Sequence, residues 1–470
     1  MAAVRAASIW AIAATVCGAC APTAVRPPPP AVPAAFERQT NQQAPWPDAG
    51  WFHGFASEEL DSLIALAQKN NLDIAAAVAK VRQADARARI AGAALLPQVN
   101  AVGTASEFVG GSHGATAHEL DWSALLSATY EVDFWGKNRA TSNSAKSQAQ
   151  ASRADLTTVK ITLSSGLASS YFQVLSLRER IAIARLNLDA ARGVLNFAEA
   201  RYQAGSMGPA ELAAQRAAVA NAELIIPALE QQEEEARGAL ALLVGAAPEG
   251  FDVRGQRLDG LAEPPLAAGL PSELLQRRPD LIATEHNLEA AHADLIAARA
   301  ALFPSLSLTA AGGVQNPAVA AAVITLTGTG WSLTAGASLM QTIFDRGRRR
   351  AVVEEAEAKQ QELVANYQHS ILAALLDVEN ALAAIQFLEM QRQFQQQNVD
   401  QSELAYRGAE ARYREGRVEY LVVLETQRFW YAAREQLSQY KLARLQALLG
   451  LCKALGGGWQ YPTGNNQRES

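Results

Sequence analysis

The stretch Tyr130–Ala140, "YEVDFWGKNRA", changes its pattern at Gly136. Polar and apolar residues alternate before this glycine, and no proline occurs after it until Pro209. A second stretch, "TIFDRGRRRA" from Thr342 to Ala351, has the same form around Gly347. Alternation with period two is typical of a strand, and a long proline-free run permits a helix. Each stretch therefore predicts a strand that passes into a helix at its glycine.

Two alternating segments of about a dozen residues end near these glycines, at residues 122–134 and 331–343. Each is apolar on one face and carries small, mostly polar residues on the other. A partner strand is expected in each half, at "PQVNAVGTAS" (97–106) and at "PSLSLTAAGG" (304–313). The alternation is less regular in the first of these. This pattern is typical of a membrane β-barrel with a wet lumen. A soluble β-sandwich is the alternative that four strands alone leave open.

Four strands are too few to close a barrel. In lipid every backbone N–H must be paired, so an open sheet edge is not tolerated there. Several chains would therefore have to share one barrel, and periodicity gives only a multiple of four strands. No apolar run is expected to approach the roughly 20 residues of a membrane-spanning helix.

Long helices are predicted after both glycines, from residue 137 to about 204 and from 346 to about 415. At about 1.5 Å per residue each would extend on the order of 100 Å. Apolar positions in the second run recur at intervals of three and four, which indicates a packing stripe. A plain coiled coil is one interpretation, and a helical tube attached to a barrel is the other. The tube also explains why each strand passes directly into a helix.

Shorter helices are predicted to run antiparallel to the long ones. They are expected at residues 57–94, 210–244, 272–301 and 420–455, and Pro227 should kink or split the second of them.

The chain repeats itself at an interval of about 210 residues. "AEARYQAG" (198–205) returns as "AEARYREG" (409–416), and "ALLP" (94–97) returns as "ALFP" (301–304). Together with the two glycine junctions these pairs occur in the same order, which indicates a tandem duplication. The expected organisation is a first repeat at 51–250, a loop-rich connection at 251–271, a second repeat at 272–459 and a polar tail at 460–470.

The N-terminus has the form of a processing segment. A single Arg5 precedes a short apolar run, and "CGAC" (17–20) follows. Residues 1–19 resemble a bacterial lipoprotein signal, which implies that Cys20 is the acylated first residue of the mature chain. An ordinary signal peptide with chance cysteines is the alternative. Residues 20–50 are proline-rich and predict an extended tether.

Composition argues against several classes of function. The net charge of −6 shows no excess of basic residues of the kind that binds nucleic acid. Only Cys452 remains downstream of residue 20, so neither a disulfide framework nor a zinc pattern is expected. No phosphate-binding glycine loop or metalloprotease motif occurs, and His286 and His292 are expected at the surface. "RRPD" (277–280) more readily starts a helix than a site. No enzymatic activity, metal or cofactor is expected.

A family resemblance rests on several motifs taken together. They are "YEVDFWGK", "LPSELLQRRPDLIATEHNLEAAHADLIAARAALFPSLSLTAAGG", "QTIFDRGRRRA", "LLDVENALAAIQ", "ARYREGRVEYLVVLETQR" and "ALGGGW". In this order the chain resembles the outer-membrane efflux channels of Gram-negative bacteria, the TolC-like family, in its lipoprotein branch of the OprM or NodT type. The resemblance covers nearly everything after Cys20.

The resemblance implies an α+β fold in a homotrimer. Each chain would give four strands to a twelve-stranded outer-membrane barrel and helices to a periplasmic tunnel. It also implies a periplasmic adaptor and an inner-membrane transporter of the resistance-nodulation-division type as partners, and lipid on Cys20. Ala21, rather than an aspartate, follows that cysteine, which by the rules of such signals directs the protein to the outer membrane.

A gate is implied at the turns that join long and short helices. Leu421 and Glu425 match family positions that line the narrowest aperture, and Tyr413 and Glu211 match positions that latch neighbouring coils. Glu211 stands where an aspartate is usual. Leu421 as helix packing and Glu425 as a solvated residue is the alternative that the sequence leaves open.

The leading functional hypothesis is a passive exit duct for small molecules such as drugs, in a tripartite efflux pump. A type I protein-secretion conduit or a metal-ion exporter is the second transport hypothesis. A periplasmic coiled-coil scaffold without a pore belongs to a different class, and conductance separates it from a channel.

Overall fold

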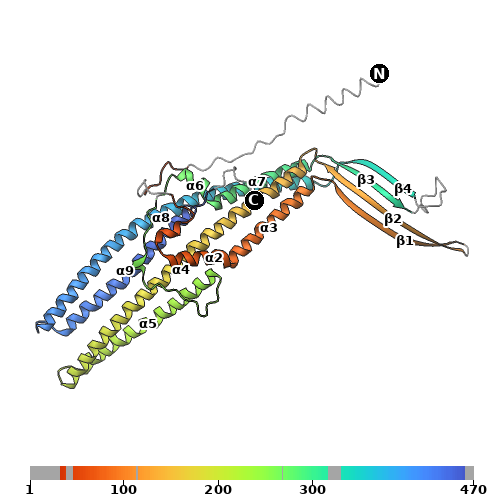
Figure 1. Ribbon diagram of the computed structural model, residues 1–470. Coiled ribbons are helices and arrows are strands. Elements are labelled where there is room, and N and C mark those ends of the chain that lie inside the picture. Colours follow the sequence, from red (N-terminus) through yellow and green to blue (C-terminus); the bar gives the residue numbers. More distant parts are fainter. Residues whose placement is uncertain (1–31, 39–45, 113–114, 267, 316–329, 461–470) are drawn as a thin grey trace. The chain divides into compact units, whose positions relative to one another are not determined.

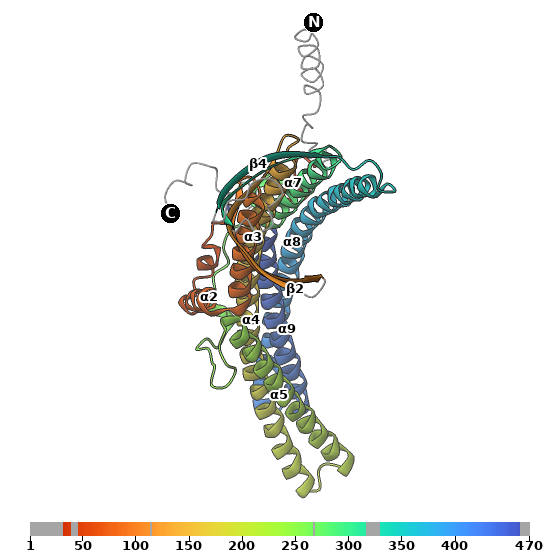
Figure 2. The ribbon, with the colours of Figure 1, turned by 90° about the vertical axis from the view of Figure 1, so that its right-hand side faces the viewer.

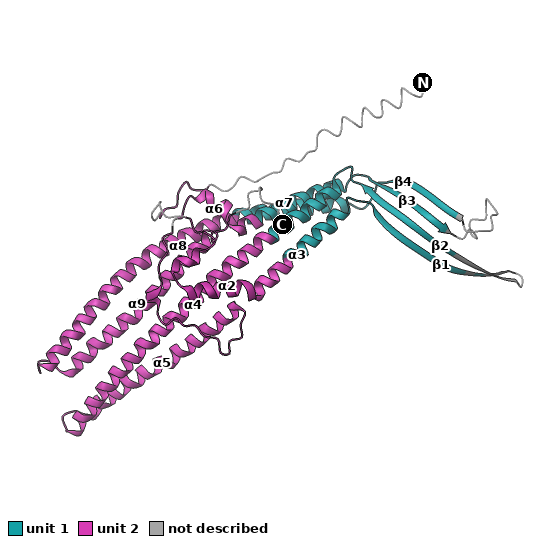
Figure 3. Cartoon of the chain, viewed as in Figure 1, with its two compact units in different colours: residues 1–29, 81–152, 284–368 teal, residues 30–80, 153–283, 369–470 magenta. Residues whose placement is uncertain are grey.

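The computed structural model describes residues 32–38, 46–112, 115–266, 268–315 and 330–460. Cys20, most of the tether and the polar tail lie outside these residues. The chain forms two compact units (Figure 3). We call them the sheet unit (residues 1–29, 81–152 and 284–368) and the coil unit (residues 30–80, 153–283 and 369–470). Each sequence repeat contributes to both units, so the repeats are not separate structural domains.

The sheet unit contains an antiparallel four-stranded sheet in the order β1-β2-β3-β4 (Figure 1). Its strands are β1 (Gln98–Ser112), β2 (Ala115–Val132), β3 (Ser305–Gln315) and β4 (Gly330–Met340). All four predicted strands are confirmed. β1 and β4 form the edges, because each pairs with one neighbour among the described strands.

Two helices of equal length follow the second strand of each repeat. These are α4 (Lys137–Gln203) and α8 (Arg348–Arg414), and both have 67 residues. Gly136 and Gly347 lie directly before them, with φ angles of 78° and 83°. These left-handed angles favour glycine, because it has no Cβ to clash with the backbone. The predicted long helices are therefore confirmed to within two residues at each end.

In the coil unit each long helix lies beside a shorter one. α4 lies beside α5 (Pro209–Val244), and α8 lies beside α9 (Tyr420–Ala454), in both views (Figures 1 and 2). Leu188 of α4 packs against Val219 and Ala222 of α5, and Val399 of α8 packs against Ala433 and Leu437 of α9. We call these pairs the α4–α5 hairpin and the α8–α9 hairpin.

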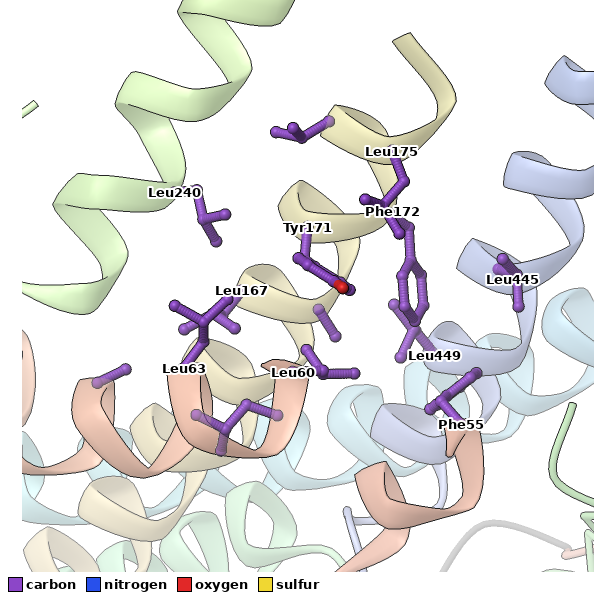
Figure 4. Close-up of a cluster of buried hydrophobic side chains, with 14 of the residues drawn as sticks. Phe55, Leu60, Leu63, Leu167, Tyr171, Phe172, Leu175, Leu240, Leu445 and Leu449 are labelled. Atoms are coloured by element: carbon purple, nitrogen blue, oxygen red, sulfur yellow. The ribbon is translucent and has the colours of Figure 1, made fainter. Parts of the chain in front are cut away.

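A hydrophobic core at the base of these hairpins holds the coil unit together (Figure 4). Phe172 of α4 contacts Phe55 of the short helix η1 (Trp51–Phe55), with ring centroids 5.1 Å apart. The other labelled residues come from α2 (Glu58–Asn70), α4, α5 and α9: Leu60, Leu63, Leu167, Tyr171, Leu175, Leu240, Leu445 and Leu449. Burying a large apolar side chain contributes about 1.5–3 kcal/mol. This core therefore anchors both hairpins to the N-terminal segment.

The connection between the repeats is held against the coil unit by charged contacts. Arg178 donates to the carbonyl oxygens of Val253 and Gly255, and Lys441 pairs with Asp259 at 2.5 Å. The Lys441 ammonium lowers the pKa of Asp259. Among the described residues of the connection before Pro271, the only helix is the three-residue η2 (Leu258–Gly260), in agreement with the loop-rich composition.

Two of the shorter helices are divided where single helices were predicted. Asn71 separates α2 from α3 (Leu72–Ala93), and its Oδ1 accepts from the N–H groups of Asp73 and Ile74. This side-chain cap starts a new helix. Arg278 separates α6 (Pro271–Arg277) from α7 (Pro279–Ala300), because a residue before proline disfavours helical angles. Pro279 starts α7, as predicted.

Pro227 does not split its helix. α5 continues through it to Val244 as one helix. A proline inside a helix removes one hydrogen bond, but the packing of α5 against α4 extends on both sides of the site. Packing on both sides therefore outweighs the local loss.

The expected surface position of His286 was wrong. Only 8% of His286 is exposed, and its Nδ1 lies 2.9 Å from Glu289 Oε2. His292 is partly buried, and its Nδ1 lies 3.3 Å from Gln360 Nε2. Both histidines therefore serve the packing of α7, which single-residue statistics could not reveal.

One described helix, α8, meets a length and composition criterion for a membrane span. An 18-residue window in it reaches a mean hydropathy of 1.7, and 28% of that window is buried. The expectation that no apolar run approaches this length was wrong for α8 by this criterion. Core helices of soluble proteins pass the same test, so composition alone does not place α8 in a bilayer.

Candidate functional site

The sheet has one apolar and one polar face. In register, Leu126 of β2 lies opposite Ala101 and Gly312, and Gly312 lies opposite Leu333 of β4. Large apolar side chains on this face are exposed, including Trp331 at 81%. On the other face the hydroxyls of Thr104 and Ser123 lie 2.7 Å apart. Such a sheet suits a barrel wall between lipid and water.

The first strand-to-helix junction is rich in contacts. Asp133 accepts from the N–H groups of Asn138 and Arg139, both at 2.9 Å, and so caps α4. Burial opposes ionisation of Asp133, but the hydrogen bonds outweigh it and lower its pKa. Trp135 stacks on Phe303 with ring centroids 4.5 Å apart and donates to the Pro304 carbonyl at 2.8 Å.

The second junction repeats the cap but has no aromatic contact among the residues that the structure describes. Asp345 accepts from the N–H groups of Gly347 and Arg349, and Arg349 donates to the Ala301 carbonyl. Ile343 and Phe344 are 89% and 82% exposed. Arg346 has a positive φ of 54° and no side-chain partner within the part of the chain that the structure describes. Two large apolar side chains of this junction are therefore exposed within one chain.

The turn of the α4–α5 hairpin places Glu211 at a helix start. Gly205 has a φ of 70°, which allows the sharp reversal after α4. The Gly208 N–H donates to Glu211 Oε2 at 3.2 Å, so Glu211 satisfies one of the free N–H groups at the start of α5. Beyond the turn, Arg192 pairs with Glu223 at 2.8 Å between the two helices.

The turn of the α8–α9 hairpin carries Tyr413. Its ring lies 4.8 Å from that of Tyr420 and 6.2 Å from that of Phe197 on α4. Burial raises the pKa of Tyr420, and the neighbouring Tyr413 and Glu410 add to the effect. This aromatic cluster of Phe197, Tyr413 and Tyr420 joins the two hairpins within the coil unit.

Leu421 and Glu425 line a groove between the hairpins. The groove has a volume of about 670 Å³ and is lined by residues of α4, α5 and α9, with Arg428 one turn after Glu425. Leu421 is 49% exposed, and Glu425 is exposed without an ion pair among the described residues. An apolar and an acidic side chain therefore lie next to each other on an open surface.

A family model described as "Outer membrane efflux protein" matches residues 63–246 and 270–457, one match in each repeat. The two segments together span well over half of the chain. The chain belongs to the outer membrane efflux protein family. Its resemblance to efflux channels and its tandem repeat are thereby confirmed.

Individual members of the family are similar over almost their whole length. The pyoverdine export outer membrane protein OpmQ of Pseudomonas putida is 44% identical over 451 residues, which cover 92% of this chain and 94% of OpmQ. The probable outer membrane lipoprotein SilC of Salmonella typhimurium is 31% identical over 451 residues, covering 94% and 96%. The cation efflux system protein CusC of Escherichia coli is 32% identical over 452 residues, covering 95% and 98%.

A crystal structure of CusC shares the fold. Its TM-score is 0.78 at 32% identity, and the match covers 93% of this chain and 99% of that one. The CusC structure is described as showing conformational changes that accompany folding and transmembrane channel formation. The outer membrane efflux protein described here is accordingly a channel protein of the outer membrane.

The structure brings together only some of the residues singled out in the sequence of this efflux protein. Leu421 and Glu425 share one groove, and Tyr413 lies in the aromatic cluster nearby. Glu211 caps α5 and has no described contact with Tyr413. Sequence reasoning missed Phe197 and Arg428. The only signal in the sequence is that each lies within a few helical turns of a hairpin turn, Phe197 before Gly205 and Arg428 after Gly416.

Proposed function

We propose that this protein is the outer-membrane duct of a tripartite efflux pump of the resistance-nodulation-division type and works as a homotrimer. The observation that carries the proposal is an amphipathic sheet of four described strands, continuous with two 67-residue helices. Its two edge strands have no further partner among the described strands. Three copies supply twelve strands, and closure removes every edge from the lipid. Periplasmic adaptor and inner-membrane transporter subunits complete the pump.

The duct is passive. The sequence has no phosphate-binding glycine loop with its lysine, and free energy for transport has to come from the partner in the inner membrane. Transport through a barrel needs only a polar lumen and an aperture that opens.

Small molecules are the proposed cargo. The support is the 44% identity with OpmQ, whose name states pyoverdine export. Metal cations are a second candidate, supported by the 32% identity with the cation efflux protein CusC. Accumulation assays in a strain that lacks this gene would separate them, because retained organic dye supports the first and retained metal ion supports the second.

Single-channel recording in planar bilayers tests the proposal. The purified full-length protein should give discrete conductance steps that favour cations. A coiled-coil scaffold without a pore would give none, and that result would reject the channel. Protein unfolded by heat before addition serves as the control for detergent artefacts.

We infer that Leu421 and Glu425 form the aperture, as an apolar and an acidic ring in the trimer. Like charges held close to the axis favour cations over anions. Glu425→Ala should therefore reduce cation selectivity. Glu355→Ala removes the same charge from an exposed position on α8 and should leave selectivity unchanged.

Tyr413 and Glu211 are proposed as the latch around this aperture. Tyr413→Phe keeps the ring contacts with Tyr420 and Phe197 and removes only the hydroxyl. Combined with Glu211→Ala, it should raise the conductance of the closed state. If both gate and latch variants behave like the parent protein, the aperture lies elsewhere.

We propose that Cys20 carries a diacylglycerol thioether and an N-acyl chain, with no other cofactor. The name of SilC supports a lipoprotein. Each buried methylene contributes about 0.8 kcal/mol of membrane affinity, so three chains hold firmly. Cys20→Ser should abolish fatty-acid labelling while some trimer still inserts. Undiminished labelling would show that another residue is acylated.

A further inference from the structure

The two edge strands of the sheet, β1 and β4, each leave one side unpaired among the described strands. The proposed function requires another copy to cover these edges, and the inference below rests on it. What the proposed function leaves open is the register, meaning which residue of one copy lies opposite which residue of the next.

The internal repeat preserves strand register. Equivalent positions are 207 apart in the first strands (Pro97 and Pro304) and 211 apart in the second strands and junctions (Gly136 and Gly347). In the β1–β2 pair, Gln98 lies opposite Thr129. Shifting these residues by 207 and 211 gives Ser305 opposite Met340, which is the observed register of β3 and β4.

The β2–β3 pair shows how one repeat joins the next. There the second strand of the first repeat pairs with the first strand of the second repeat, and Val132 lies opposite Leu306. The equivalent of Val132 in the second repeat is Ile343, 211 residues later. The equivalent of Leu306 in the first repeat is Val99, 207 residues earlier. Within one chain β1 and β4 lie at opposite edges of the sheet. A Val99 that pairs with Ile343 must therefore belong to a second copy.

Strand lengths support this assignment. β2 extends to Val132, although its pairing with β1 begins only at Thr129, so β3 alone holds residues 130–132 in the sheet. β4 ends at Met340, the equivalent of Thr129. Residues 341–343 are the equivalents of 130–132 and have no strand partner among the described residues. The strand therefore ends where a partner is missing.

We propose that β1 of a second copy pairs antiparallel with β4, with Met340 opposite Val102 and Ile343 opposite Val99 of that copy. Residues 341–343 then join β4 on assembly. In this register Ile343 and Val99 lie on the exposed apolar face, because Val99 shares the face of Leu126 and Ile343 continues the face of Leu339. A slip by one residue would turn Val99 to the polar face.

A disulfide between copies tests the register. Thr342→Cys combined with Asn100→Cys places two thiols opposite each other in the proposed pair. Within one chain these positions lie three strand spacings apart, about 14 Å, which exceeds the roughly 7 Å limit for a disulfide. Any bond is therefore between copies, and mild oxidation should link most chains covalently.

The matched controls shift one cysteine by two residues on the same face. Thr342→Cys with Gln98→Cys, or with Val102→Cys, should cross-link about tenfold less, because opposed Cα atoms must lie within about 7 Å. Each single-cysteine variant controls for Cys452, which is buried, and for Cys20. Reducing agent should reverse every bond.

The mass and conductance of the same preparations separate two failures. An oligomer that conducts but cross-links best with the cysteine at position 98 or 102 would overturn the register and leave the channel proposal standing. A preparation that forms no oligomer and conducts no ions would overturn both. Preferred cross-linking at position 100 in a conducting oligomer supports the inference.

Discussion

The two strand-to-helix junctions have the same backbone and different surroundings. At the first, Trp135 stacks on Phe303 and donates to the Pro304 carbonyl. The first repeat contributes Trp135 and the second contributes Phe303 and Pro304, so both repeats stabilise this junction. At the second, Ile343 and Phe344 are exposed and Arg346 adopts a positive φ of 54°. The comparison teaches that the same motif is packed inside the chain at the first junction and leaves large apolar side chains exposed at the second.

The largest effect should come from removing the aromatic contact at the first junction. Trp135→Ala removes a ring stack and a hydrogen bond. It should lower the free energy of unfolding by about 2–3 kcal/mol, which is less than for a fully buried tryptophan because Trp135 is partly exposed. Arg346→Ala at the second junction should change stability by less than about 0.5 kcal/mol. Denaturant unfolding of the detergent-solubilised protein measures both. Equal losses would mean that the two junctions are alike within one chain.

Backbone strain should be similar at both junctions. An added Cβ at Gly136 or Gly347 meets no atom within 4 Å, so only the left-handed φ opposes a side chain. Gly136→Ala and Gly347→Ala should each cost about 1–2 kcal/mol. Arg346→Gly relieves the same kind of strain and should stabilise the protein by up to about 1 kcal/mol. A large difference between the two alanine variants would show that the backbones are not equivalent.

The smallest effect concerns the acid stability of the first junction. The folded pKa of Asp133 is lowered, so its carboxylate stabilises the protein above its unfolded pKa, about 3.9. This contribution is lost as the pH falls through the lower folded pKa. Asp133→Asn keeps a side-chain oxygen that can cap α4 but has no carboxyl group to titrate. It should therefore reduce the dependence of the free energy of unfolding on pH between about pH 5 and pH 2. A parent protein whose unfolding midpoint does not change over this range would contradict the assignment.

The sequence was sufficient for the main elements and insufficient for their contacts. Period-two alternation and the proline-free runs after Gly136 and Gly347 predicted the strands and long helices, because these patterns extend over many residues. The breaks at Asn71 and Arg278 depend on single caps and single φ/ψ restrictions, which a long helical pattern conceals.

The candidate site was predictable in part for a similar reason. Leu421 and Glu425 were found through a family pattern next to a turn. Their groove is also lined by residues of α4 and α5, about 200 positions earlier in the chain, and the aromatic cluster joins Phe197 to Tyr413. Such contacts depend on tertiary packing, which the periodicity of one helix does not contain.

The mass of the detergent-solubilised protein tests the central claim most directly, that several copies share one barrel. One chain has a mass of 50.1 kDa. Light scattering corrected for bound detergent should therefore give about 150 kDa for the species that conducts ions, because closure in lipid needs more than four strands. A monomer that conducts ions in planar bilayers would contradict the account.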